Sequence, residues 1–227
     1  VTVPTNASIG QLGARFRIST VGGLGALGSA IDGEVEDYFV RVALNDFGDL
    51  PDTFGTTLAQ DGARHLAGTG LYLGAGVTSD LNGLPSAPAN RDRDDGVTFS
   101  STLIAGIGAR LNVVASQAGK LDAFIDFNGN GVFDSDERVT PIGGLTLAAG
   151  TNSVYVEVPV TAVAGARAAR FRLSSAGGLS AKGASADGEV EDYIMNVVSP
   201  AEDTIQLLPD PESPGQQLIY VKGTAGN

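Results

Sequence analysis

The amino-acid sequence predicts an all-β protein, built as an antiparallel β-sandwich or jelly-roll-like repeat unit with a partial second unit. Short alternating apolar and polar runs lie between turns of Gly, Asn and Asp. No stretch combines a 3.6-residue apolar stripe with helix caps. Glycine accounts for 32 of 227 residues, roughly twice the usual ~7%. The expected strands span residues 71–77, 97–103, 109–115, 121–127, 153–160, 170–174 and 190–197.

An internal repeat defines the order of these elements. Residues 1–42 align without gaps to residues 156–197, and the seven letters DGEVEDY occur in both copies. We therefore expect residues 1–44 to be the C-terminal half of a preceding unit and residues 45–198 to be a complete unit. The first stretch is too short to bury a sandwich core alone. Its missing strands come from upstream sequence, from the full unit or from another chain.

The remaining residues, 199–227, predict a Pro-rich linker and the first strand of a following domain. Four prolines between residues 199 and 215 favour an extended spacer. The run LIYVKG at residues 218–223 then has the composition of a strand. The chain begins with Val1 inside a strand-like pattern, and we expect it to be a piece of a longer polypeptide.

Composition excludes several classes of function. Without Cys the chain has no disulfides, thiolate metal sites or thiol nucleophiles. Its single His rules out a site with two or three His ligands. The net charge of −12 argues against a nucleic-acid partner, because phosphate binding needs a basic surface. No run of about 18 apolar residues predicts a membrane span.

The clearest chemical motif is DFNGNGVFDSDE at residues 126–137, which fits a twelve-residue calcium loop at every specified position. Oxygen ligands at fixed spacing converge on a hard cation, a Gly permits the sharp turn, and a terminal Glu supplies two oxygens. The flanking runs are strands, so no helix pair opens on binding. The alternative is a turn rich in Asn, Gly and Asp that binds no metal. The predicted Ca²⁺ ligands are Asp126, Asn128, Asn130, Val132 through its carbonyl, Asp134 and Glu137.

The second motif is DGEVEDY together with ARFR. On neighbouring strands, Glu189 and Glu191 would form ion pairs with Arg170 and Arg172, and residues 1–44 repeat the pattern. One alternative is a cation or glycan site made by Asp187, Glu189 and Asp192. A pair of catalytic carboxylates is the other alternative.

Two further stretches rich in acids, at residues 45–52 and 92–96, are either solvated turns or cation sites. A cation at residues 45–52 would stiffen the joint between the units. The only histidine, His65, is expected to be a packing or surface residue. The sequence contains no Gly-x-Ser-x-Gly nucleophile motif and no phosphate-binding loop.

The motifs in their order resemble the GEVED domain family, named for the residues at 33–37 and 188–192. They are NDFGDLPDTFGT at 45–56, DGARH at 61–65, DDGVTF at 94–99, the segment 121–139, and ARFRLSS with GEVEDY at 169–193. The resemblance implies a β-sandwich module, often in tandem, in secreted or surface-anchored bacterial proteins, and no enzymatic activity. The last five residues resemble the start of a calcium-binding RTX-like nonapeptide repeat.

We therefore expect a non-enzymatic, calcium-stabilised structural or adhesive module of a long extracellular bacterial protein, secreted or on the cell surface. Its expected partners are neighbouring repeats or other copies of the protein, in arrays or in a filament formed by strand donation. Surface or matrix glycans are further expected partners. The alternative function is a carbohydrate-binding or carbohydrate-cleaving sandwich, although the low aromatic content of 6% argues against it.

Overall fold

The computed structural model describes all residues except 1–7, 9, 201–203, 211, 214 and 223–227. It divides the chain into two compact units, Val1–Leu44 and Asn45–Asn227. The described residues form strands and two short 3₁₀ turns, η1 (Asp52–Phe54) and η2 (Leu58–Gln60), so the predicted all-β class is confirmed. Neither turn is long and apolar enough to span a membrane. The RTX-like resemblance at residues 223–227 lies outside the described residues.

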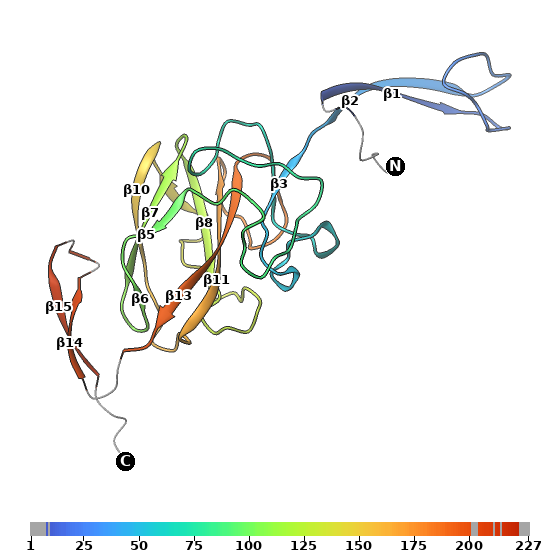
Figure 1. Ribbon diagram of the computed structural model, residues 1–227. Coiled ribbons are helices and arrows are strands. Elements are labelled where there is room, and N and C mark those ends of the chain that lie inside the picture. Colours follow the sequence, from blue (N-terminus) through green and yellow to red (C-terminus); the bar gives the residue numbers. More distant parts are fainter. Residues whose placement is uncertain (1–7, 9, 201–203, 211, 214, 223–227) are drawn as a thin grey trace. The chain divides into compact units, whose positions relative to one another are not determined.

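The first unit is a single antiparallel hairpin of β1 (Gly10–Ile18) and β2 (Glu34–Val42), drawn in blue in Figure 1. Arg15 lies opposite Asp37 and holds it with two hydrogen bonds, from Nε at 2.6 Å and from Nη2 at 2.7 Å. The ring of Phe16 packs edge-on against Tyr38. Both rings are about half exposed, at 53% and 50%. The hairpin therefore has its local contacts, while these two apolar rings remain half exposed.

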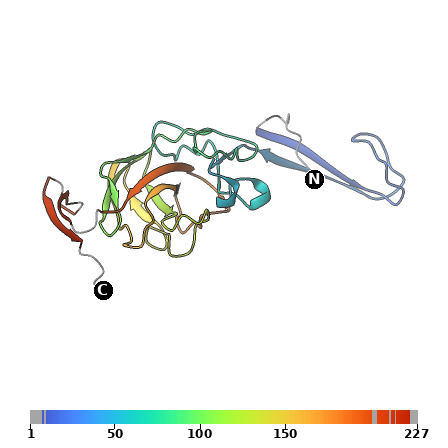
Figure 2. The ribbon, with the colours of Figure 1, turned by 60° about the horizontal axis from the view of Figure 1, so that its bottom comes forward.

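In the second unit, two sheets form the sandwich. The five-stranded sheet has the order β6-β13-β11-β8-β9, and the three-stranded sheet has the order β10-β7-β5. The long strands β11 and β13 lie side by side in both ribbon views (Figures 1 and 2). The bounds are β5 (Val97–Phe99), β6 (Leu103–Ile104), β7 (Ala109–Ala115), β8 (Gly119–Ile125), β9 (Leu145–Leu147), β10 (Gly150–Val156), β11 (Gly165–Ser174) and β13 (Glu189–Val198).

Two smaller sheets complete the unit. The order of the first is β12-β4-β3, from β3 (Asn45–Phe47), β4 (Arg64–Leu66) and β12 (Ala184–Ser185). The second is a hairpin of β14 (Thr204–Pro209) and β15 (Gln217–Lys222). Most pairings are antiparallel, and the exceptions are the two-residue parallel pairings β12–β4 and β13–β6.

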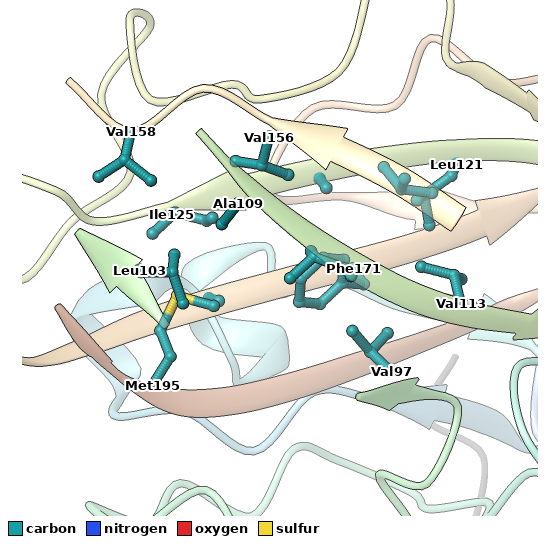
Figure 3. Close-up of a cluster of buried hydrophobic side chains, with 14 of the residues drawn as sticks. Val97, Leu103, Ala109, Val113, Leu121, Ile125, Val156, Val158, Phe171 and Met195 are labelled. Carbon is teal, nitrogen blue, oxygen red and sulfur yellow. The ribbon is translucent and has the colours of Figure 1, made fainter. Parts of the chain in front are cut away.

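The hydrophobic core lies between the two large sheets. Figure 3 shows Val113, Val156, Leu121, Ile125 and Phe171 gathered in this core; the first two come from β7 and β10, and the other three come from β8 and β11. Leu121, Ala123 and Ile125, which alternate along β8, all belong to this core, whereas Phe124 between them does not. Burial of such apolar side chains is the main contribution to the stability of this unit.

The structure corrects two predicted strands. The segment 71–77 is not a strand, although Leu71 and Leu73 are buried as their alternation predicts. Gly74 has φ of +59° and leaves no room for a Cβ atom, which would lie 1.9 Å from Asp95 Oδ1, so the chain turns there. The expected strand 97–103 is divided between β5 and β6, because a bend at Ser100 and Ser101 carries the chain from one sheet to the other.

The C-terminal spacer was also predicted wrongly in part. Residues 204–209 form β14, which pairs with β15 across a turn. The strand predicted at 218–223 is confirmed as β15, but its partner is this preceding segment. The runs IQLL and LIYV are both rich in apolar residues, as strands are, and Pro209 lies at the end of β14, where a proline is tolerated.

Between β4 and β5 the chain runs from residue 67 to residue 96 without a regular strand or helix, teal to green in Figures 1 and 2. We call this segment the 67–96 connection. Its anchors include Leu73, which forms a single bridge to Ala115, and Asp80, which forms one to Asn45. Side-chain hydrogen bonds to β13, described below, supply further anchors.

Candidate metal centre

The 126–137 loop begins where β8 ends. The backbone N–H of Ile125 donates to the carbonyl of Glu137 at 3.0 Å, and that of Asp126 donates to the carbonyl of Ala168 on β11 at 2.9 Å. These two bonds hold both ends of the loop against the five-stranded sheet. Asp126 and Glu137 are therefore buried, at 4% and 3% exposure, although they end a turn that is otherwise largely solvent-facing.

The carboxylate of Asp126 organises the first half of the loop. Its Oδ1 accepts the N–H groups of Gly129 and Asn130, at 2.7 and 3.2 Å, and its Oδ2 accepts that of Gly131 at 3.1 Å. Three converging N–H donors form a concave nest for an anionic group. Gly131 has φ of +86°, a conformation that favours glycine and allows the chain to fold back here.

Glu137 closes the other half of the loop. Its Oε1 accepts the N–H of Asn128 at 3.1 Å and its Oε2 accepts that of Asp134 at 3.0 Å. Burial raises the pKa of this carboxyl group, and the neighbouring Asp126 and Asp134 carboxylates raise it further. The side chain thus stands at the base of the loop with two other acids close enough to repel it.

The remaining predicted ligands gather at Asp134. The side-chain amides of Asn128 and Asn130 donate to its Oδ2 at 3.0 and 2.7 Å. Their carbonyl oxygens accept backbone N–H groups within the loop, the one from Val132 reaching Asn130 at 3.0 Å. A side-chain carbonyl has two lone pairs, so each oxygen can accept this bond and still face a cation. Rotation of the amides would bring those oxygens to the centre.

The loop therefore brings its five predicted side-chain ligands to one turn, and Val132 contributes a backbone bond within it. In the described residues, no three His, Asp or Glu side chains already form a metal-binding group. The donor set, hard oxygens with two buried carboxylates, fits Ca²⁺ in its chemistry. The hydrogen bonds inside the loop are equally what a turn without metal would use, so both sequence hypotheses stay predictions.

The DGEVEDY motif departs from the predicted ion pairs. The β11–β13 register places Arg170 opposite Asp192, and Glu191 opposite Phe171. Opposed residues point to the same face of a sheet, so the glutamates face the core side and the arginines the other side. Arg170 binds Asp192 with two bonds, of 2.7 and 2.8 Å, and both side chains are fully buried.

Arg172 likewise has partners other than the predicted glutamates. It donates to the backbone carbonyls of Ser180, Lys182 and Gly183 and to Nε2 of His65. The alternative ligand set of Asp187, Glu189 and Asp192 is not assembled either, since Asp187 binds Ser175 through N–H and hydroxyl. The strand register, which the sequence alone does not show, decides that Arg170 faces Asp192 rather than a glutamate.

His65 is a packing residue, as predicted. It is fully buried, its Nδ1 lies 2.7 Å from the carbonyl of Asp187, and its Nε2 accepts the Arg172 bond at 3.0 Å. Burial lowers its pKa well below the usual value, and the adjacent Arg172 charge lowers it further. The imidazole is therefore neutral, with Nδ1 as donor, and both nitrogens are engaged.

Fold and site together define an all-β sandwich module that has a buried Arg–Asp pair between its two longest strands and a loop with calcium-type spacing. The family model of the GEVED domain matches residues 1–41 and 120–196, which is more than half of the chain. The chain belongs to the GEVED domain family. No curated protein and no solved structure matches it.

Proposed function

We propose that the chain is a non-enzymatic module of a long extracellular bacterial protein, with a structural or adhesive role and a fold stabilised by Ca²⁺ at the 126–137 loop. The observation that carries this proposal is the convergence of Asp126, Asp134 and Glu137 in one turn anchored to the five-stranded sheet. Extracellular modules use such sites at millimolar calcium, where even weak affinity saturates them.

A non-enzymatic role is supported by the state of the one histidine. A general base must reach its substrate proton and have a pKa near the working pH. His65 is buried, neutral and hydrogen-bonded at both nitrogens. Arg170 is likewise bonded to the Asp192 carboxylate, and Arg172 is bonded to backbone carbonyls such as that of Ser180. These groups maintain the module.

Neighbouring repeats or other copies of the protein are the proposed partners. The first unit repeats the β11–β13 hairpin in sequence, yet Phe16 is 53% exposed where its counterpart Phe171 is fully buried. Val35 is 54% exposed, against 1% for Val190. Phe171 and Val190 lie on opposite faces of their hairpin, and the second unit covers both faces. A covering layer of the same type, from a repeat, would complete the first hairpin.

The test is thermal unfolding of the 227-residue chain in Ca²⁺ and in chelator. We expect Ca²⁺ to raise the melting temperature, because a ligand that binds only the folded state stabilises it. Asp126→Asn and Glu137→Gln should each remove much of this rise. Asp136→Asn is the matched control, since Asp136 lies in the same loop but is exposed and is not a predicted ligand.

A melting temperature that does not respond to Ca²⁺, or a rise that is undiminished in both loop variants, would contradict the assignment of this loop. Glycan-array binding that is lost in Asp126→Asn would instead favour the carbohydrate-binding alternative.

A further inference from the structure

Five carboxylates of the second unit, which we call the five-acid cluster, share an arrangement that the 126–137 loop lacks. In each, one oxygen accepts a backbone N–H, while the other is buried and has no hydrogen-bond partner within the described part of the chain. The partnerless atoms are Asp46 Oδ1, Asp49 Oδ1, Asp92 Oδ2, Asp94 Oδ2 and Glu189 Oε1. A buried polar atom without a partner is costly, and five in one region need a physical reason.

The hydrogen-bonded oxygens tie three segments of the chain together. Asp46 on β3 accepts the N–H of Val190 on β13 at 2.7 Å, and Asp94 in the 67–96 connection accepts that of Asp192, also on β13, at 2.9 Å. Asp49, just after β3, accepts the N–H of Arg91 in the connection. Each segment is thus bonded to the other two.

Two further bonds hold the remaining members. Glu189 begins β13 and accepts the N–H of Leu73 in the connection, while Asp92 accepts the N–H of its neighbour Arg93 at 2.8 Å. Asp46, Asp49 and Glu189 are each only 1% exposed. The three bonded segments therefore enclose carboxylates whose second oxygens are withdrawn from solvent and unused.

Among the described residues, no basic side chain forms an ion pair with a member of this cluster. Burial raises the pKa of Asp94 and of Glu189 to about 9 and that of Asp92 to about 7, and the neighbouring carboxylates add to the rise. The buried Arg170, whose charge acts on Asp49, is already paired with Asp192. Asp80, Glu191 and Asp192 add further negative charge beside the cluster.

We propose that the five-acid cluster is a binding site for a divalent cation of the Ca²⁺ class, separate from the 126–137 loop. Ca²⁺ takes six to eight oxygen ligands and tolerates flexible geometry, so the unused oxygens match its requirement in type and in number once water completes the shell. The described residues do not form a closed metal-binding group as they stand. Binding of the ion would therefore require the five carboxylates to draw together.

The site gives the connection a role. Residues 67–96 lack regular strands, and the cluster links them to β3 and to the start of β13, which carries the second DGEVEDY copy. A cation held there would fix the connection against the sandwich. It would also give a role to Glu189, which points to the core side of the sheet. Asp192 of the same motif points to the other face, where it pairs with Arg170.

The first experiment measures Ca²⁺ stoichiometry of the chelator-treated chain by isothermal titration calorimetry. We expect the double variant Asp46→Asn/Asp94→Asn to bind one ion fewer than the wild type and to retain the site that Asp126→Asn removes. Asp95→Asn is the matched control, because Asp95 lies in the same acidic stretch but has both oxygens bonded, to Ala75 and Arg93. An unchanged stoichiometry in the double variant would overturn the proposal.

Thermal unfolding adds a test that loss of folding cannot imitate. Asn keeps the acceptor oxygen but removes the charge, so in chelator the double variant should melt at a higher temperature than the wild type. In Ca²⁺ the order should reverse. A double variant that melts higher in both conditions would show that the acids are neutralised by protons alone and would contradict the cation site. The loop variant Asp126→Asn should show no such reversal, which separates this site from the proposed function.

Discussion

At the scale of single residues, the buried pair of Arg170 and Asp192 holds β11 and β13 against the segment 50–55 and against Ala181. Besides Asp192, the guanidinium donates to the carbonyls of Phe54 and Gly55, at 2.9 and 2.8 Å, and to Ala181 at 2.9 Å. The second oxygen of Asp192 also accepts the N–H of Leu50 at 3.0 Å. One ion pair therefore joins two strands to the 3₁₀ turn η1.

Removal of one partner should be strongly destabilising. We expect Asp192→Asn to lower the free energy of unfolding by about 3–5 kcal/mol, because it leaves a buried guanidinium without its counter-charge. The equivalent change in the first unit, Asp37→Asn, should have no measurable effect, since that pair is exposed to solvent. Urea denaturation of both variants checks the difference. Equal losses in the two variants would contradict the role assigned to burial.

The partner of Arg170 also marks what single residues reveal from sequence alone. Alternation correctly grouped Glu189 with Glu191 and Arg170 with Arg172, because side chains two apart share a face. It could not say whether the two arginines share a face with the two glutamates or with Asp192, since a register shift by one residue exchanges the faces of a strand. Only the observed register identifies Asp192 as the partner.

At the scale of elements, the two copies of the hairpin form a natural comparison. β1–β2 and β11–β13 have nearly the same sequence and the same register of Arg opposite Asp. In the second copy Leu173 of β11 is fully buried in the core, whereas its counterpart Ile18 in the first copy is 69% exposed. A two-stranded hairpin alone is marginal in water.

Amide hydrogen exchange should therefore separate the two copies. We expect the amides of β11 and β13 to exchange far more slowly than those of β1 and β2, because opening the second copy requires disruption of the core. Mass spectrometry of peptides from both segments measures this directly. Comparable protection of β1–β2 at low protein concentration would show that the first hairpin is covered within its own chain. Protection that increases with concentration would point to cover by other copies.

Element prediction from sequence succeeded where periodicity and packing agree. β7 matches its expected bounds, 109–115, because every second residue along the full strand is a buried apolar residue. The segment 71–77 has the same alternation but is interrupted by Gly74, whose left-handed backbone outweighs the pattern. The five-acid cluster was beyond sequence reasoning as a unit, since its members come from segments more than 40 residues apart that only the fold brings together.

At the scale of the whole molecule, the acidic balance should appear in the pH dependence of stability. In chelator, the folded state holds Asp94 and Glu189 at pKa values of about 9, against about 4 for ordinary carboxyls. Between pH 7 and 9 the folded state then binds more protons than the unfolded state, so the free energy of unfolding falls as pH rises. Arg172, whose pKa burial lowers to about 9, opposes this fall near pH 9, and His65 opposes it only near pH 7, where an unfolded histidine is still partly protonated.

The corresponding measurement is the melting temperature in chelator from pH 7 to pH 9. We expect a decline in the wild type, which becomes shallower in Asp46→Asn/Asp94→Asn because two acids with raised pKa have been removed. A wild-type melting temperature that stays level or increases over this range would contradict the charge state assigned to the cluster.

The central claim, that the 126–137 loop holds a calcium ion, is tested most directly by a crystal structure of the chain grown in Ca²⁺. We expect one ion with oxygen ligands from Asp126, Asn128, Asn130, Asp134 and Glu137 and the carbonyl of Val132, at the ~2.3–2.6 Å typical of calcium. The two Asn amides would then be turned so that their oxygens face the ion. A loop that keeps both amide nitrogens on Asp134, with no ion at its centre, would contradict the account.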